Sequence, residues 1–142
     1  MKISADVRNH FDGPFGPPIT QQQIDSAEQS LGHELPAPLK QHYAQYDGFK
    51  GPTETNFLYP LEELVRTTLW LRGEGYFPDF LQHSVALGED GTGAYWVIDI
   101  KRPDKVIEWD AEMEGEEHVV LDRSLAEEWI ARLIRYENAA GT

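Results

Sequence analysis

Cysteine is absent from this sequence, and so is any long apolar run. Without a thiol, the chain can form no disulfide, bind no zinc through thiolates and use no cysteine nucleophile, which is typical of a reducing compartment. The first residues have no apolar core of the kind that a signal peptide needs, and no later segment is a plausible membrane span. We therefore expect a soluble cytoplasmic protein.

Basic residues are scarce: 12 Lys and Arg stand against 25 Asp and Glu, which gives a net charge of −13. This charge repels phosphate backbones, so it disfavours nucleic-acid binding and favours a basic partner. Residues 1–60 hold 7 acids and 4 bases, whereas residues 61–142 hold 18 acids and 8 bases. The densest stretch of acids is 108–117, which carries Glu108, Asp110, Glu112, Glu114, Glu116 and Glu117.

Apolar and aromatic residues are plentiful. The chain is 40% hydrophobic and has 4 Trp, 6 Tyr and 6 Phe, which is too much for a disordered protein. Its 142 residues suit one ordinary domain with a single core. Prolines and glycines crowd residues 10–18 and predict irregular structure there. We expect a lead-in over 1–19, one domain over 20–137 and a frayed tail over 138–142.

The first half of the chain predicts helices. The first covers about 20–31, because Thr20 and Gln23 form a capping box and Gly32 follows the last apolar residue. The second begins after Pro36, whose ring suits a first helical turn, and continues through Leu39, Tyr43 and Tyr46 to Asp47-Gly48. A short strand at 56–59 precedes a third helix, which Pro60 opens and Gly73 and Gly75 end.

Beyond residue 84 the pattern changes to short apolar runs between turns rich in glycine, proline and acids. These runs predict strands of an antiparallel sheet at 85–87, 94–100, 105–109 and 118–121. Within 94–100, Trp96, Ile98 and Ile100 share the more apolar face. A capping box at Ser124 predicts a closing helix over about 124–133. The order of these elements predicts an α+β fold, with an antiparallel sheet packed against N-terminal helices and a C-terminal helix.

Patterns for catalysis or metal binding are weak. Asp90 and Asp99, with the acids near Glu108, could form a carboxylate pair for glycoside hydrolysis, but such pairs arise by chance among 25 acids. Gly88, Gly91 and Gly93 fit a hairpin turn with positive φ better than a phosphate cradle. No serine-hydrolase motif occurs. We expect neither an enzyme nor a bound cofactor.

The histidines and tryptophans also have ordinary explanations. The five histidines form no HxH or HExxH pattern, so we expect surface or helix-end positions and no metal site. They are His10, His33, His42, His83 and His118. Trp96, Trp109 and Trp129 are expected in the core, although Trp70 and Trp109 are alternatives as exposed anchors for a partner.

The order of several motifs resembles a known family. The opening pattern is Ile24-x2-Ala27-Glu28-x2-Leu31-Gly32-x2-Leu35-Pro36-x2-Leu39-x3-Tyr43-x2-Tyr46-Asp47-Gly48. Three later segments follow in the family's order, namely Phe57–Leu64, Gly88–Asp99, and Val106–Asp110 followed by Ser124–Ile130. Together they resemble the SMI1/KNR4 (SUKH) family over roughly residues 20–133, with Ala94 standing where the family often has aspartate.

This resemblance implies a non-catalytic domain that binds another protein, in bacteria commonly a toxin delivered by neighbouring cells. We expect an immunity protein that binds and neutralises a basic toxin, such as a nuclease. The expected contact residues are Asp90, Tyr95, Glu108, Asp110, Glu112, Glu114, Glu116 and Glu117. An alternative is a cellular scaffold or regulatory module with a host partner. A carbohydrate-acting enzyme would require a deep cleft that holds two carboxylates.

Overall fold

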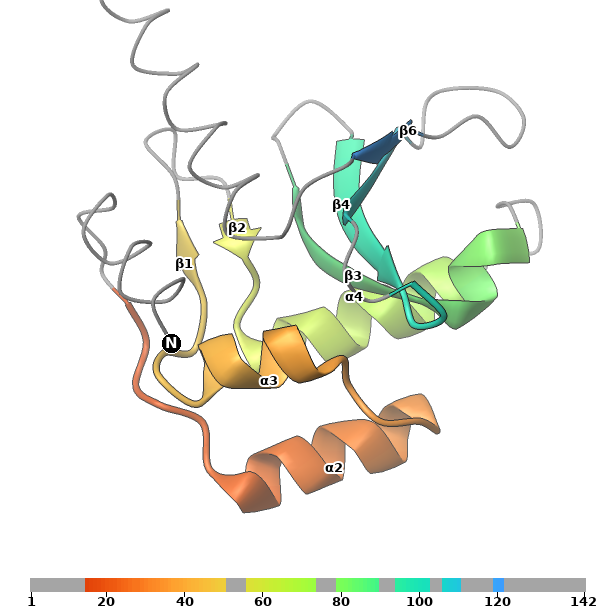
Figure 1. Cartoon of the computed structure of the whole chain (residues 1–142). Coiled ribbons are helices and arrows are strands. Elements are labelled where there is room, and N and C mark those ends of the chain that lie inside the picture. The colour runs from red at the N-terminus through yellow and green to blue at the C-terminus, as the bar shows by residue number, and fades with distance from the viewer. Residues whose placement is uncertain are drawn as a thin grey trace, which may run out of the picture.

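The computed structural model describes residues 15–50, 56–73, 79–89, 94–102, 106–110 and 119–121. The elements in chain order are α2 (Gln21–Leu31), α3 (Ala37–Tyr43), β1 (Phe49–Lys50), β2 (Asn56–Leu58), α4 (Leu61–Gly73), the 3-10 helix η1 (Asp79–His83), β3 (Ser84–Glu89), β4 (Ala94–Asp99), β5 (Val106–Asp110) and β6 (Val119–Leu121). Figure 1 shows their arrangement.

The strands form two antiparallel sheets. One has the order β1-β2 and the other the order β3-β4-β5-β6, so neighbours in the larger sheet are also neighbours in sequence. Helix α4 contacts both β3 and α2, and it therefore lies between α2 and the larger sheet (Figure 1). This arrangement confirms the α+β class. The expected closing helix over 124–133 lies outside the described residues.

The start and end of α2 follow from its sequence. Thr20 Oγ1 accepts a hydrogen bond from the Gln23 N–H at 3.2 Å, and Gln23 Oε1 accepts one from the Thr20 N–H at 2.9 Å. At the other end, Gly32 has a φ of +83° and its N–H donates to the Glu28 carbonyl at 2.9 Å. Both the capping box and the glycine stop are confirmed.

Helix α3 is shorter than its apolar spacing indicates. Pro36 precedes its first residue, but the helix ends at Tyr43 with Ala44 as its C-cap. The chain then turns, and the Tyr46 N–H donates to the His42 carbonyl at 3.1 Å. Tyr46 is still fully buried. The helical spacing thus identified the buried residues correctly but overstated the helix by about one turn.

The predicted strands are confirmed to within a residue or two, with two additions and one correction. Neither β1, with two residues, nor η1 was predicted, since both are too short for a hydrophobic period to show. In β4, burial extends to Val97 and Asp99 as well as Trp96 and Ile98. Both faces of β4 are therefore covered, whereas alternation predicted one distinctly more apolar face.

The outer edge of β3 is closed by groups from earlier in the chain. The Tyr59 N–H, just after β2, donates to the Leu87 carbonyl at 2.7 Å. Thr68 Oγ1, from α4, accepts from the Ala86 N–H at 3.0 Å. Backbone groups that would otherwise be open on this edge strand are thus satisfied within the chain.

Gly88 has a different role from the one its spacing suggested. It lies inside β3, opposite Trp96 and beside a register shift, and it is not among the glycines of positive φ, Gly32 and Gly48. A Cβ at Gly88 would collide with the carbonyl oxygens of Asn56 and Phe57. The residue must be glycine because β2 crosses β3 closely, so the hairpin explanation is wrong for Gly88. Gly91 and Gly93 lie outside the described residues.

Two tryptophans anchor the core. Trp96 is fully buried and meets Phe57 of β2 edge to face, with ring centroids 4.9 Å apart. Trp109 is 1% exposed, which confirms it as a core residue and contradicts its alternative as an exposed anchor. Trp70 on α4 is 47% exposed, so it remains a candidate for an exposed anchor that contacts a partner. Trp129 lies outside the described residues.

His42 lies in the last turn of α3, which is one of the helix-end positions expected for the histidines, but it does not lie on the surface. It is 3% exposed, and its Nδ1 bonds to the Tyr46 hydroxyl. Burial lowers the pKa of His42 to about 4, because an imidazolium there would lose its hydration. His33 and His83 are half-buried beyond α2 and at the end of η1, while His10 and His118 lie outside the described residues.

Candidate functional site

The expected contact residues that the structure describes, Tyr95, Glu108 and Asp110, gather at one end of the larger sheet. Ala94 at the start of β4 pairs with Asp110 at the end of β5, and Glu89 at the end of β3 pairs with Tyr95. These pairs place the three strand ends side by side. The other expected contact residues, Asp90, Glu112, Glu114, Glu116 and Glu117, lie outside the described residues.

The register separates this sheet end into two faces, because residues directly opposite each other in an antiparallel pair share a face. Tyr95 is opposite both Glu89 and Trp109, so these three share one face. Glu108 is opposite Trp96, and Asp110 is opposite Ala94, so both acids lie on the other face. Tyr95, Glu108 and Asp110 are all half-buried. The predicted contact residues thus meet at one end without sharing one surface.

Aromatic rings and one carboxylate line the Tyr95 face. The Tyr95 and Trp109 rings are stacked, with centroids 6.1 Å apart and planes 26° apart. Tyr59 donates its hydroxyl hydrogen bond to Glu89 Oε2 at 2.9 Å. Burial raises the pKa of Tyr95, and the negative charge of Glu89 adds to this shift. Burial and the bond to Glu89 likewise raise the pKa of Tyr59.

Glu89 is a site residue that the sequence prediction missed. Its position is set by the pairing of β3 with β4, which puts it opposite Tyr95. An acid at the end of a strand that leads into a hairpin could have been paired with the residue starting the return strand. The bulge between Ala86 and Gly88 changes the register, so counting residues alone gives the wrong partner.

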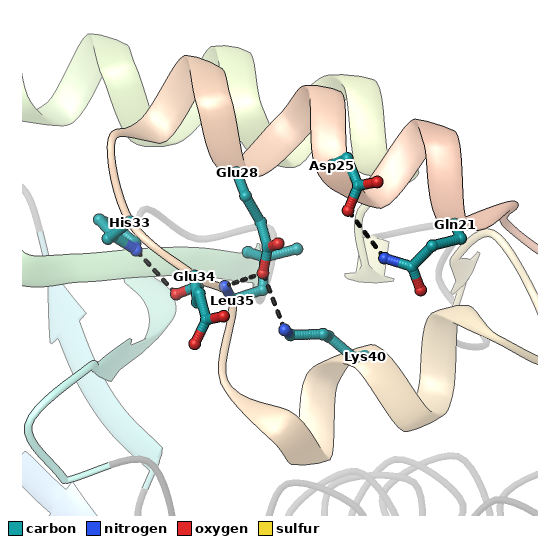
Figure 2. Close-up of polar contacts among 7 residues, drawn as sticks. All are labelled: Gln21, Asp25, Glu28, His33, Glu34, Leu35 and Lys40. Carbon is teal, nitrogen blue, oxygen red and sulfur yellow. Dashed lines mark hydrogen bonds and ion pairs between the residues drawn. The ribbon is translucent and has the colours of Figure 1, made fainter.

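A second polar cluster joins α2 to α3 (Figure 2). Glu28 Oε2 accepts from the Leu35 N–H at 2.7 Å and pairs with Lys40 Nζ at 2.9 Å. Burial alone would raise the pKa of Glu28, but the hydrogen bonds from Lys40 and Leu35 outweigh it and lower the pKa. The carboxylate therefore holds the α2–α3 connection in place.

Arg72 of α4 joins three segments. Its Nη1 donates to the Leu31 carbonyl at 3.0 Å, and its Nη2 donates to the Ser84 carbonyl at 3.1 Å and to His33 Nε2 at 2.6 Å. A guanidinium only donates, so His33 Nε2 is the acceptor in this bond. His33 Nδ1–H then donates to the Glu34 carbonyl at 2.9 Å (Figure 2). Burial lowers the pKa of Arg72.

The Asp47-Gly48 turn connects α3, β2 and α4. Asp47 Oδ1 accepts from the Leu61 N–H at 2.7 Å and so caps the start of α4. Gly48 has a φ of +81°, and a Cβ there would come within 2.6 Å of the Leu58 carbonyl oxygen. The Tyr43 hydroxyl donates to the Tyr59 carbonyl. These contacts explain why an acid and a glycine follow each other here.

A cleft of about 320 Å³ opens between α2 and the start of α4. We call it the α2–α4 cleft. Its apolar lining consists of Ile19, Ala27, Leu61 and Val65. Its polar lining consists of Gln23, Ser26, Ser30, Asp47 and Glu62. Nothing in the sequence prediction pointed to this cleft, because its residues come from three separate segments.

The model of the SMI1 / KNR4 family (SUKH-1) matches residues 18–132, most of the chain. The chain belongs to the SMI1/KNR4 family. The match begins just before α2 and extends beyond β6, so every described element lies within it. The family is known for immunity-type proteins and is generally non-catalytic. A search of the curated proteins finds no match to this chain.

The SMI1/KNR4 motif residues of this chain are chiefly structural. Gly32 ends α2, Asp47 caps α4, and Gly48 allows β2 to pass close by. Tyr43 and Tyr46 are buried. The motifs that reveal the family therefore maintain the fold, and they do not identify a contact surface.

Metal-binding clusters and membrane-spanning helices are both absent from the described ranges. There, no group of three or more His, Asp and Glu side chains is arranged to hold a metal ion. No helix among the same residues is long and apolar enough to span a bilayer. Asp99, the described member of the suggested carboxylate pair, accepts from the Lys101 N–H at 2.9 Å, which is the turn role expected for a strand-end aspartate.

Proposed function

We propose that this SMI1/KNR4 protein is an immunity protein that binds and neutralises a cognate basic bacterial toxin, such as a nuclease, in the cytoplasm. The observation that carries the proposal is the gathering of Glu89, Glu108 and Asp110 at one sheet end in a chain of net charge −13. The sequence continues from Asp110 directly into Glu112, Glu114, Glu116 and Glu117.

The negative charge at this end of the larger sheet would help the protein to bind a basic toxin. Complementary charge steers a basic partner into the right orientation and raises the association rate, by about tenfold or more at low salt. Fast capture matters for an inhibitor, because every uninhibited toxin molecule damages the cell until it is bound. Aromatic side chains such as Tyr95 beside the acids would add contact area once the charges have met.

Neutralisation needs no chemistry from this chain. The protein would cover the active site or another essential surface of the toxin, without a cofactor and without catalysis. Family membership supports this interpretation, because the SMI1/KNR4 family is generally non-catalytic.

A growth assay tests the proposed function. The reading frame adjacent to this gene would be expressed in a heterologous bacterium, alone and together with this chain. We expect growth arrest from the first and normal growth from the second, with a stable complex on size-exclusion chromatography. A neighbouring product that is harmless, or a toxin that this chain does not counteract, contradicts the immunity function and favours a scaffold with a host partner.

Charge neutralisation then tests the sheet end as the contact. A variant with Glu108→Gln, Asp110→Asn and Glu→Gln at 112, 114, 116 and 117 should associate with the toxin about tenfold more slowly at low salt, with a weaker salt dependence. A control with Asp25→Asn and Glu34→Gln removes exposed acids far from this end. Equal rates in stopped-flow measurements of both variants would remove the acidic stretch from the interface.

A further inference from the structure

The α2–α4 cleft has a mixed lining that includes apolar residues and two acids. Ala27, Leu61 and Val65 supply apolar surface, whereas Glu62 and Asp47 supply negative charge. Among the described residues that line it, none is Lys or Arg. Arg66 is exposed on α4 but does not line the cleft.

The two helices that form the cleft run in the same direction (Figure 1). Gln23 of α2 and Leu61 of α4 line the cleft near the helix starts, and Arg72 Nη1 reaches the Leu31 carbonyl at the helix ends, at 3.0 Å. Along α2 the lining extends from Gln23 to Ser30. At a rise of 1.5 Å per residue, this length is roughly 10 Å.

Apolar surface continues along α4 beyond the cleft. Leu61, Val65 and Leu69 are spaced by four residues and therefore follow one side of the helix. Their exposure rises in that order, from the buried Leu61 through the half-buried Val65 to Leu69, which is 43% exposed. An apolar stripe thus rises from the floor of the cleft onto the open surface.

The negative charge lies at the opposite end of this stripe. Glu62 is exposed in the first turn of α4, next to Asp47. Asp47 already accepts a hydrogen bond from the Leu61 N–H, which also satisfies the positive end of the helix. Glu62 is exposed whereas Asp47 is half-buried, so Glu62 is the more accessible of the two carboxylates.

We propose that the α2–α4 cleft binds a helical segment of the cognate basic protein. That segment would place a Lys or Arg side chain beside Glu62 and an apolar side chain against Leu69. Residues seven apart lie on one side of a helix and are about 10 Å apart, which matches the spacing of Glu62 and Leu69 along α4. Charge complementarity selects a basic segment, and the proposal rests on the proposed function in taking the toxin as its source.

A blocking variant with a matched control tests the cleft. Ser26 is exposed and lines the cleft, so Ser26→Arg puts bulk and positive charge into it. Gln29 is exposed on the same helix and does not line the cleft, so Gln29→Arg adds the same group elsewhere. In calorimetric titrations with the purified toxin, we expect Ser26→Arg to weaken binding by about tenfold or more and Gln29→Arg to leave it unchanged. Equal affinities for both variants overturn the proposal.

Single-charge variants refine that test. Glu62→Gln should weaken binding by about threefold to tenfold, whereas Glu63→Gln removes the same charge from the same helical turn outside the cleft and should have little effect. Equal losses would mean that the overall charge matters and the cleft does not. Far-UV circular dichroism would check that every variant keeps the helical content of the wild type.

A peptide titration separates this proposal from the proposed function. The ¹⁵N-labelled full chain would be titrated with a helical peptide of about 15 residues that carries Lys and Leu seven positions apart, and with a scrambled peptide of the same composition. We expect chemical-shift changes along α2 and α4 with the first peptide alone. Equal effects from both peptides, or changes elsewhere, overturn the cleft assignment whether or not the chain protects against a toxin.

A second copy of the chain is the other protein that could occupy the α2–α4 cleft. Sedimentation velocity over a range of concentrations should show a monomer whose behaviour does not change on Ser26→Arg substitution. A dimer that this variant weakens would assign the cleft to self-association and overturn the proposal.

Discussion

Carboxylates play different parts in the helical layer and at the end of the larger sheet. In the helical layer, Glu28 and Asp47 accept backbone hydrogen bonds and fix how segments join. At the sheet end, Glu89 shares a face with the stacked rings of Tyr95 and Trp109, while Glu108 and Asp110 lie on the other face. The acids of this chain therefore fall into two groups. Some stabilise the fold through hydrogen bonds, and others produce the negative potential that a partner would meet.

The largest expected effect concerns the helical layer. Gly48→Ala should lower the free energy of unfolding by about 3 kcal/mol or more, because it adds both positive-φ strain and a collision with the Leu58 carbonyl. Gly32→Ala has a similar φ of +83° but no atom within 4 Å of the new Cβ, so it should cost only about 1 kcal/mol. Urea unfolding measures both. Equal losses would show that close packing at the Asp47-Gly48 turn adds nothing.

The next effect depends on pH and involves His42. Its pKa is about 4 in the folded protein and near 6.5 in the unfolded chain, so the unfolded chain takes up the proton first as the pH falls. The contribution of His42 to the free energy of unfolding is therefore complete above pH 6.5 and declines between pH 6.5 and 4. At pH 5 the loss should be about 2 kcal/mol. His42→Phe should lack this part of the decline, and parallel pH profiles of the two proteins would contradict the assignment.

A smaller effect separates the two bonds of Glu28. Glu28→Ala leaves the N–H of the buried Leu35 without its acceptor and should cost about 1.5 kcal/mol. Lys40→Ala removes a partly exposed ion pair and should cost about 0.5 kcal/mol. Urea unfolding of both variants at pH 7 gives this difference. A larger loss from Lys40→Ala would show that the ion pair, and not the backbone bond, holds the α2–α3 connection.

The smallest effect tests the sheet end. Glu89→Gln should cost about 1 kcal/mol through the weakened bond to Tyr59, and it should lower the pKa of Tyr95 by removing the nearby negative charge. Glu108→Gln lies on the other face and should leave the pKa of Tyr95 unchanged. Phenolate absorbance during a pH titration reports this pKa. Equal shifts in both variants would contradict the separation into two faces.

Much of this fold could be predicted from local sequence signals. Capping boxes, glycine stops and strand alternation depend on residues close in sequence, which is why α2, β2 and the strands of the larger sheet were found. The end of α3 was not, because Tyr46 has helical spacing but is held by a turn. The role of Gly88 and the burial of His42 depend on segments far away in sequence.

The candidate sites likewise include residues that the local sequence predicts and residues that depend on tertiary packing. The acid-rich sheet end was visible in the sequence, because Glu108 and Asp110 are neighbours in one strand. Glu89 was not, because a bulge sets its partner. The α2–α4 cleft could not be predicted at all, since the packing of α2 against α4 creates it and neither helix carries a recognisable motif for it.

The closed edge of β3 has a consequence for colloidal behaviour. An open edge strand recruits strands of other molecules and begins aggregation, but here Tyr59 and Thr68 already occupy the backbone groups of Leu87 and Ala86. A net charge of −13 adds mutual repulsion between copies. Salt screens that repulsion and leaves the hydrogen bonds of the edge intact, so protection at β3 persists at ionic strengths where the charge no longer keeps copies apart.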